Sequence, residues 1–77
     1  MLRYYLDLGA YTFHIKRGRG GWVLSVDSKP LLPCYRSPEA AAEAVATCNT
    51  GFERYDRVAE MGLVEPPADL TGWELRD

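Results

Sequence analysis

Hydrophobic and polar residues alternate along two neighbouring segments of this chain. In residues 11–16 every second side chain is apolar, and the same pattern returns in residues 22–27. Strict alternation is the period of a strand with one buried face. The five residues 17–21 between the two segments include three glycines, which tolerate the backbone angles of a tight turn. The pattern therefore predicts a β-hairpin.

Two shorter segments extend this hairpin. Residues 4–8 are expected to add a strand before Gly9 bends the chain, and residues 31–35 to add one after a turn at residues 27–30. Pro30 and Pro33 lack a backbone N–H, so the later strand is expected at an edge of the sheet or in irregular form. The sequence predicts an antiparallel meander of three or four strands.

A helix is predicted to follow the strands. Ser37 can cap it, Pro38 suits the first helical position, and Glu39 complements the positive end of the helix dipole. The alanine-rich run after them has high helix propensity. Its apolar stripe, at the spacing i, i+3, i+4 and i+7, consists of Ala41, Ala44, Val45 and Cys48. The helix is expected to end at residues 49–51.

The remainder of the chain predicts a second, shorter helix and a tail. Residues 52–61 carry apolar side chains on one side and charged ones on the other, and Gly62 is a stop signal. Residues 65–68 form a stiff connector that contains two prolines. Trp73, near the end, is expected to dock on the core and hold the tail down, and a short recognition arm is the alternative.

Together these elements predict an α+β fold in one domain, residues 1–77. A β-meander occupies residues 1–36, a helical part residues 37–63, and a connector and docked C-terminal tail residues 64–77. One face of the meander is expected to be covered by the first α-helix. The expected core consists of Phe13, Ile15, Trp22, Leu24, Val26, Ala41, Ala44, Val45 and Cys48.

The distribution of charge changes this picture most, because basic and acidic residues are concentrated in different halves of the chain. Residues 1–36 hold six of the nine Lys and Arg residues and two acids, about +4, whereas residues 37–77 hold three basic residues and nine acids, about −6. The formal net charge of −2 therefore hides a basic strand-forming part and an acidic helical part. Two regions of opposite sign on so short a chain favour contact with another macromolecule over chemistry.

Cysteine usage and hydropathy bear on the compartment. Cys34 and Cys48 are expected as small buried apolar side chains, and a disulfide is the alternative. No secretory signal is visible, and the uncharged stretches fall short of the roughly 20 apolar residues of a membrane span. We expect a cytoplasmic protein that makes no membrane contact.

The residues that could carry chemistry are sparse, and we expect no enzymatic activity, no catalytic residue and no cofactor. His14 lies on the polar side of its strand, where Ser25 and Asp27 can share its face, but any polar sheet face gathers such residues. Two cysteines and one histidine without paired ligand spacing predict no metal site. A solvated surface histidine is the expected reading.

Binding is the remaining explanation, and we expect a non-enzymatic protein-interaction module with an unidentified protein partner. The first expected contact is the basic hairpin tip, Lys16, Arg17 and Arg19. The second is an acidic face, Glu39, Glu43, Glu53 and Glu60. One alternative is a purely structural role. The other is nucleic-acid binding, with phosphates at the hairpin tip and bases stacked on Tyr4, Tyr5, Tyr11 and Trp22. A homodimer through the open sheet edge is compatible with the protein-interaction module.

The run GGWVLSVDSKPLLPCYRSPEAAAEAV, with the later TGFERYD and DLTGWELRD, resembles many small bacterial and prophage-encoded proteins. In these a strand-turn-strand leads into an alanine-rich helix capped by Ser-Pro-Glu. The resemblance covers about two thirds of the chain and rests on structural motifs, so it carries over no functional residue. It implies a bacterial or phage origin and a class that includes inhibitors of host complexes, such as anti-CRISPR proteins.

Overall fold

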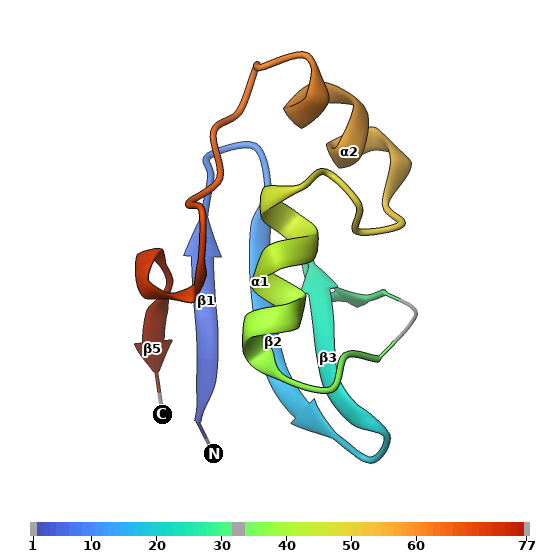
Figure 1. The fold of residues 1–77 in the computed structure, drawn as a ribbon, viewed down its shortest axis with the longest axis vertical. Helices are drawn as coiled ribbons and strands as arrows, with labels where there is room; N and C mark the ends of the chain where they lie inside the picture. Colours follow the sequence, from blue (N-terminus) through green and yellow to red (C-terminus); the bar gives the residue numbers. More distant parts are fainter. Residues whose placement is uncertain (1, 32–33, 77) are drawn as a thin grey trace.

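The computed structural model describes residues 2–31 and 34–76, and these form an antiparallel sheet with two α-helices on one side (Figure 1). The strands are β1 (Arg3–Asp7), β2 (Thr12–Gly18), β3 (Gly21–Val26), β4 (Lys29–Pro30) and β5 (Glu74–Arg76). Their order across the sheet is β4-β3-β2-β1-β5. The predicted α+β class and meander are confirmed, with five strands in place of three or four.

The β2–β3 hairpin forms where the alternation predicted it. Gly18 lies opposite Gly21 at its closed end, and Gly21 adopts a φ of +132° that side chains disfavour. Phe13 and Val26 are opposite each other and both face the core. The alternating positions thus place Phe13, Ile15, Leu24 and Val26 on one side, in the core, whereas the hairpin end of that side, at Arg17 and Trp22, stays partly exposed.

The edge beyond β3 is short, and the predicted position of its strand is wrong. β4 has two residues, Lys29 and Pro30, which lie inside the predicted turn at 27–30 and before the predicted strand at 31–35. The tight turn takes only Asp27 and Ser28, both with positive φ, and the Leu31 N–H donates to the Leu24 carbonyl oxygen at 2.8 Å. Residues 32 and 33, part of the predicted strand at 31–35, lie outside the described residues. Tyr35 returns to β3 and makes an isolated antiparallel bridge with Trp22.

The fifth strand comes from the C-terminal tail. After a 3₁₀ turn (Leu70–Gly72), β5 pairs antiparallel with β1, and Leu75 lies opposite Tyr4. Trp73, between the turn and the strand, is 7% exposed and packs 6.3 Å from the Phe13 ring. The prediction of a docked tail is confirmed. Sequence reasoning did not foresee that the tail completes the sheet.

Helix α1 (Pro38–Ala46) begins as predicted, because the Ser37 hydroxyl accepts a hydrogen bond from the Ala40 N–H at 3.1 Å. Its buried side is built almost entirely from alanine, with the small side chains Ala41, Ala42 and Ala44 beside Val45. Small side chains let the helix lie close to the sheet, in front of β2 and β3 (Figure 1).

The predicted end of α1 at residues 49–51 is wrong, and so is the place of Cys48 in its apolar stripe. The helix stops at Ala46, and Cys48 takes a left-handed conformation with a φ of +60°. The N–H groups of Cys48 and Asn49 then donate to the Val45 and Ala44 carbonyl oxygens at 3.4 and 2.9 Å. This is a Schellman ending, in which a residue other than the usual glycine reverses the chain.

Helix α2 (Glu53–Glu60) is confirmed, with Phe52 and Met61 as its flanking caps. The Asp56 carboxylate accepts hydrogen bonds from the Thr50 hydroxyl and from the N–H groups of Thr50 and Gly51, at 2.8 to 3.2 Å. The Thr50 hydroxyl in turn accepts from the Phe52 N–H at 3.0 Å. Asp56, one of the charged residues of the segment 52–61, thus fixes the turn that leads into α2.

Seven of the nine predicted core residues are buried, namely Phe13, Ile15, Leu24, Val26, Ala41, Ala44 and Val45. Trp22 is half-buried at the margin of the core, and Cys48 lies beyond the helix end. The prediction missed Leu6, Ala42, Tyr55 and Trp73. Tyr55 closes the core from α2, where its hydroxyl donates to the Val45 carbonyl oxygen at 3.0 Å.

Both cysteines are free thiols. Cys34 is exposed and lies beside Gly20 and Gly21 of the hairpin, and Cys48 is half-buried. The expectation that both are buried core residues is wrong. Among the described residues no helix has the length and apolar character needed to cross a bilayer.

Candidate binding surface on the open face of the sheet

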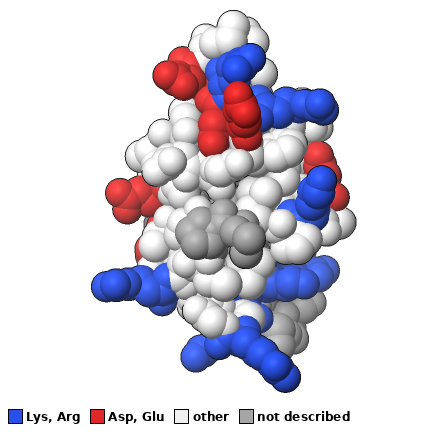
Figure 2. Space-filling model, turned by 90° about the vertical axis from the view of Figure 1, so that its right-hand side faces the viewer, with Lys and Arg blue, Asp and Glu red and all other residues white. Residues whose placement is uncertain are grey.

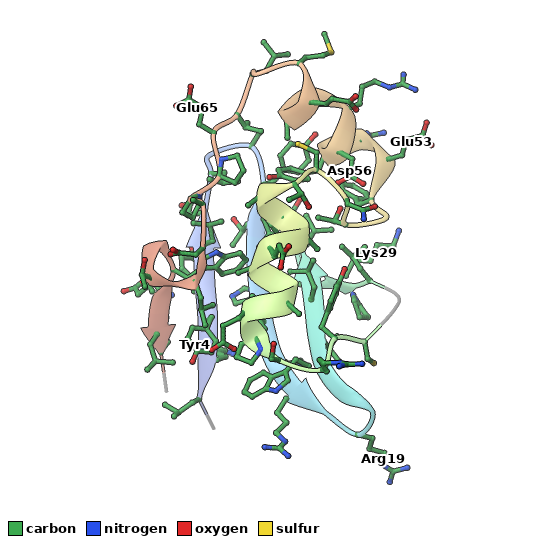
Figure 3. The ribbon with its side chains drawn as sticks, in the orientation of Figure 1. Tyr4, Arg19, Lys29, Glu53, Asp56 and Glu65 are labelled. Carbon is green, nitrogen blue, oxygen red and sulfur yellow. The ribbon has the colours of Figure 1, made fainter. Side chains whose placement is uncertain are left out.

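The sheet has a helix-covered face and an open face. Phe13, Ile15 and Leu24 point into the core, so their neighbours along each strand point the other way. In the described residues no helix lies over that second face (Figures 1 and 3). We define the open face by the side chains that lie there: Arg3, Tyr5 and Asp7 of β1, His14 and Lys16 of β2, Val23 and Ser25 of β3, and Glu74 and Arg76 of β5.

Three cations form one row across the open face. Arg3 lies opposite Lys16 on one side and opposite Arg76 on the other, so the row crosses β2, β1 and β5. Like charges directly opposite each other destabilise a sheet. Arg76 is offset in part by Glu74, whose carboxylate lies 2.8 Å from its guanidinium on the exposed surface. The fold therefore gathers positive charge where neighbouring strands would otherwise avoid it.

A second row, next to the cations, carries flat groups. Tyr5 lies opposite His14, and the two ring centroids are 5.1 Å apart with a tilt of 54°. The Arg76 guanidinium lies 3.8 Å from the centroid of the Tyr5 ring, a close cation–π contact. Tyr5 and His14 are each half-buried. The open face thus presents stacked, partly exposed π-surfaces beside a line of positive charge.

The cation row acts on the histidine. Partial burial, followed by the positive charges of Arg3, Arg76 and Lys16, lowers the pKa of His14 below its ordinary value of 6.5. The unfolded chain takes up the proton more readily than the folded one. The contribution of His14 to stability is therefore fully present above about pH 6.5 and is lost as the pH falls through the lower folded value.

We predict that an NMR pH titration of the imidazole, the one histidine in the sequence, gives a pKa below 6.5. Lys16→Gln is expected to raise that pKa, because it removes a cation from the open face. Arg54→Gln, which changes the same charge on α2, is the matched control and should leave it unchanged. A pKa at or above 6.5, or equal effects of the two substitutions, would contradict this electrostatic picture.

His14 lies at a small hollow of the open face, whose lining and size limit what it can bind. His14 and Ser25 are opposite each other and help line a hollow of about 160 Å³ with Arg3, Lys16 and Ser28. No hydrogen bond joins the imidazole to the Ser25 hydroxyl among the described residues. Small-molecule sites commonly measure about 300–1,000 Å³. The hollow suits an anionic group held by the cations better than a complete substrate.

The structure separates the residues expected at the basic hairpin tip. Lys16 lies on the open face, whereas Arg17 pairs with Trp22 and its guanidinium lies 6.0 Å from that ring. Arg19 occupies the turn itself and projects from the end of the molecule (Figure 3). In Figure 2 Lys and Arg side chains gather toward this end. The three residues share one end of the molecule without converging on one point.

The residues expected in an acidic face lie on two helices. Glu39 and Glu43 are exposed on α1, and Glu53 and Glu60 are exposed on α2. Glu53 pairs with Arg57 at 3.1 Å on the helix surface. Figure 2 shows basic side chains among the acidic ones at the α2 end. The basic end of the molecule is the more uniform of the two in charge.

Sequence reasoning missed two cations of the open face, Arg3 and Arg76. For Arg3 a signal existed, because it directly precedes the strand predicted at residues 4–8 and alternation puts it on the same face as Tyr5. For Arg76 there was none, since it pairs with a residue about 70 positions away in the chain. The same pairing leaves the outer side of β5 as a short sheet edge, and a homodimer at such an edge stays a prediction.

Fold and surface together describe a small α+β domain whose sheet has one helix-covered face and one basic, ring-bearing open face. No family model, curated protein or solved structure matches the chain.

Proposed function

We propose that this chain is a non-enzymatic interaction module that binds an anionic macromolecule through its basic end. The basic end consists of the cation row Arg3, Lys16 and Arg76 together with Arg17 and Arg19 of the hairpin. The observation that carries the proposal is the cation row itself. Three positive side chains in cross-strand register repel one another in the free protein, and a bound anion relieves that repulsion.

The surroundings of His14 support a non-enzymatic role. A histidine that acts as a general base must become an imidazolium, and enzymes stabilise that cation with a carboxylate. Arg3, Arg76 and Lys16 instead disfavour the protonated ring. The same environment suits binding, because an arriving anion and a protonated His14 would stabilise each other.

Retention on a polyanionic resin such as heparin tests this proposal. We predict retention at low salt and early elution as salt rises, since exposed charge contacts are screened. The variant Arg3→Gln/Lys16→Gln/Arg76→Gln should pass through the column or elute at clearly lower salt. Lys29→Gln/Arg54→Gln/Arg57→Gln removes the same charge from exposed positions elsewhere and should elute near the parent protein.

Thermal melts of both triple variants complete the experiment, because they show whether each variant is folded once the Arg76 contacts with Glu74 and Tyr5 are removed together with the repulsion. Two results would contradict the proposal. One is failure of the folded parent protein to bind the resin at low salt. The other is equal loss of binding in the two variants, which would indicate that net charge alone controls retention.

A further inference from the structure

We infer that the open face binds a single-stranded nucleic acid, with its phosphates on the cation row and its bases on the Tyr5–His14–Arg76 surface. This inference rests on the proposed function and names the chemistry of the partner. It places the contact on the sheet, in contrast to the hairpin tip that the sequence indicated for nucleic acid.

Two parallel rows on the open face match the two sides of a single strand. Positions two residues apart on a strand are separated by about 6.6 Å, so the row of Arg3 lies about that far from the row of Tyr5. One row is cationic and crosses three adjacent strands. The other carries the rings of Tyr5 on β1 and His14 on β2, and it ends at Glu74 on β5. Sequence-tolerant single-strand sites combine these two features, a positive track for the backbone and rings for the bases.

Arg76 has a part in both rows. Its guanidinium comes from the cation row and leans over the Tyr5 ring at 3.8 Å, so the ring is capped by a flat, charged group. Bases stack on arginine planes as well as on aromatic rings. The Arg76 side chain is also 45% exposed, which leaves its outer surface accessible. A base stacked there would be next to the phosphate contacts of Arg3.

The rings distinguish this partner from an acidic protein or a duplex. An acidic peptide would use the cations and gain little from the tilted Tyr5–His14 pair. A duplex keeps its bases stacked on one another, so the rings would find no free base face. Nor does burial account for the rings, since Tyr5 and His14 lie on the face away from the core and are only half-buried. Partly exposed rings beside a cation row suit unstacked bases.

Fluorescence anisotropy with labelled 12-nucleotide strands, oligo-U and oligo-dT, tests the inference at low salt. We expect both strands to bind and a 12-base-pair duplex to bind at least about tenfold more weakly. A plot of log affinity against log salt should have a slope of about −2 for three phosphate contacts, and Lys16→Gln should reduce it by about 0.7. Poly-glutamate serves as the polyanion without bases and should compete poorly.

Ring variants separate stacking from charge. Tyr5→Leu and His14→Leu leave the net charge at neutral pH unchanged. Each should weaken single-strand binding about tenfold, the usual effect of removing one stacking side chain. Tyr35→Leu is the matched control, a half-buried tyrosine at the Trp22 bridge on the other side of the hairpin, and should bind as the parent does. Thermal melts confirm that all three variants are folded.

The outcomes distinguish this inference from the proposed function. Equal binding of poly-glutamate and oligonucleotides, with Tyr5→Leu unchanged, would overturn the nucleic-acid inference and leave the anion-binding function standing. A duplex that binds as tightly as a single strand would also overturn it. Failure of every polyanion to bind would overturn both.

Discussion

Replacement of Tyr55 by alanine is expected to leave most of the protein unfolded at 25 °C. The Tyr55 ring is fully buried and packs edge-on against Phe13 and Tyr11, with centroid distances of 4.7 and 5.5 Å. Truncation of a buried aromatic residue to alanine costs about 3–5 kcal/mol. A core in a chain of this size supplies about that much stability in total. Urea titration followed by circular dichroism measures the loss.

Two further substitutions make the Tyr55 result specific. Tyr55→Phe keeps the ring and removes the hydrogen bond to the Val45 carbonyl oxygen, so it should cost about 1 kcal/mol. Arg54→Ala changes the adjacent, exposed residue of α2 and should stay within about 0.5 kcal/mol of the parent. Tyr55→Ala within 1 kcal/mol of the parent would contradict the docking of α2 on the sheet.

The dependence of stability on alkaline pH is a second measurement of the burial of Tyr55. Burial, with smaller contributions from Cys48 and Asp56, raises the pKa of Tyr55 far above its ordinary value of 10. The unfolded chain therefore ionises first. The contribution of the neutral Tyr55 hydroxyl to stability is therefore full below about pH 10 and is lost as the pH rises further. Tyr55→Phe has no hydroxyl to ionise, so its stability should fall less steeply above about pH 10 than that of the parent protein.

Gly21→Ala is expected to destabilise the protein by about 3 kcal/mol. A Cβ atom at Gly21 would lie 2.5 Å from the Tyr35 carbonyl oxygen, and the φ of +132° is strained for any side chain. That oxygen cannot move freely, because it accepts from the Trp22 N–H at 2.7 Å while the Tyr35 N–H donates to the Trp22 carbonyl oxygen at 2.8 Å. The substitution therefore opposes both hydrogen bonds of the bridge. Urea titration measures the effect.

Neighbouring glycines serve as controls for the Gly21 prediction. Among the described residues an added Cβ at Gly20 meets the Cys34 Sγ atom alone, at an ordinary 3.7 Å, so Gly20→Ala should cost less than about 1 kcal/mol. Gly9 has a φ of +87° and open space around it, so Gly9→Ala reports the backbone conformation alone, about 1 kcal/mol. A cost for Gly21→Ala no larger than for Gly9→Ala would refute the close approach of Tyr35.

The sequence predicted the elements whose signals are local. The β2–β3 hairpin follows from alternation around a glycine-rich turn, and the start of α1 follows from Ser37 and Pro38. The end of α1 was missed because a cysteine at residue 48 took the left-handed position that glycine usually holds. The role of Asp56 was missed because the sequence pattern is the same whether this carboxylate bonds to the preceding turn or points into solvent.

The candidate surface depends on pairing between distant parts of the chain, which no local pattern encodes. Arg76 joins Arg3 only because the tail adds β5 to the sheet beside β1. Consecutive basic residues were expected to act together, but alternation along β2 directs Lys16 and Arg17 to opposite faces. On the face that Figure 2 shows, the charge division of the sequence persists only in part: Lys and Arg side chains gather toward the hairpin end, whereas basic and acidic side chains mix at the α2 end.

Mapping of amide chemical shifts by NMR during titration with a single-stranded oligonucleotide tests the central claim most directly, because it reports where an anionic partner touches the folded protein. The account predicts salt-sensitive shifts concentrated on β1, β2 and β5, at and beside Arg3, Tyr5, His14, Lys16 and Arg76. Shifts confined to α1 and α2, with the three strands unchanged, would contradict it.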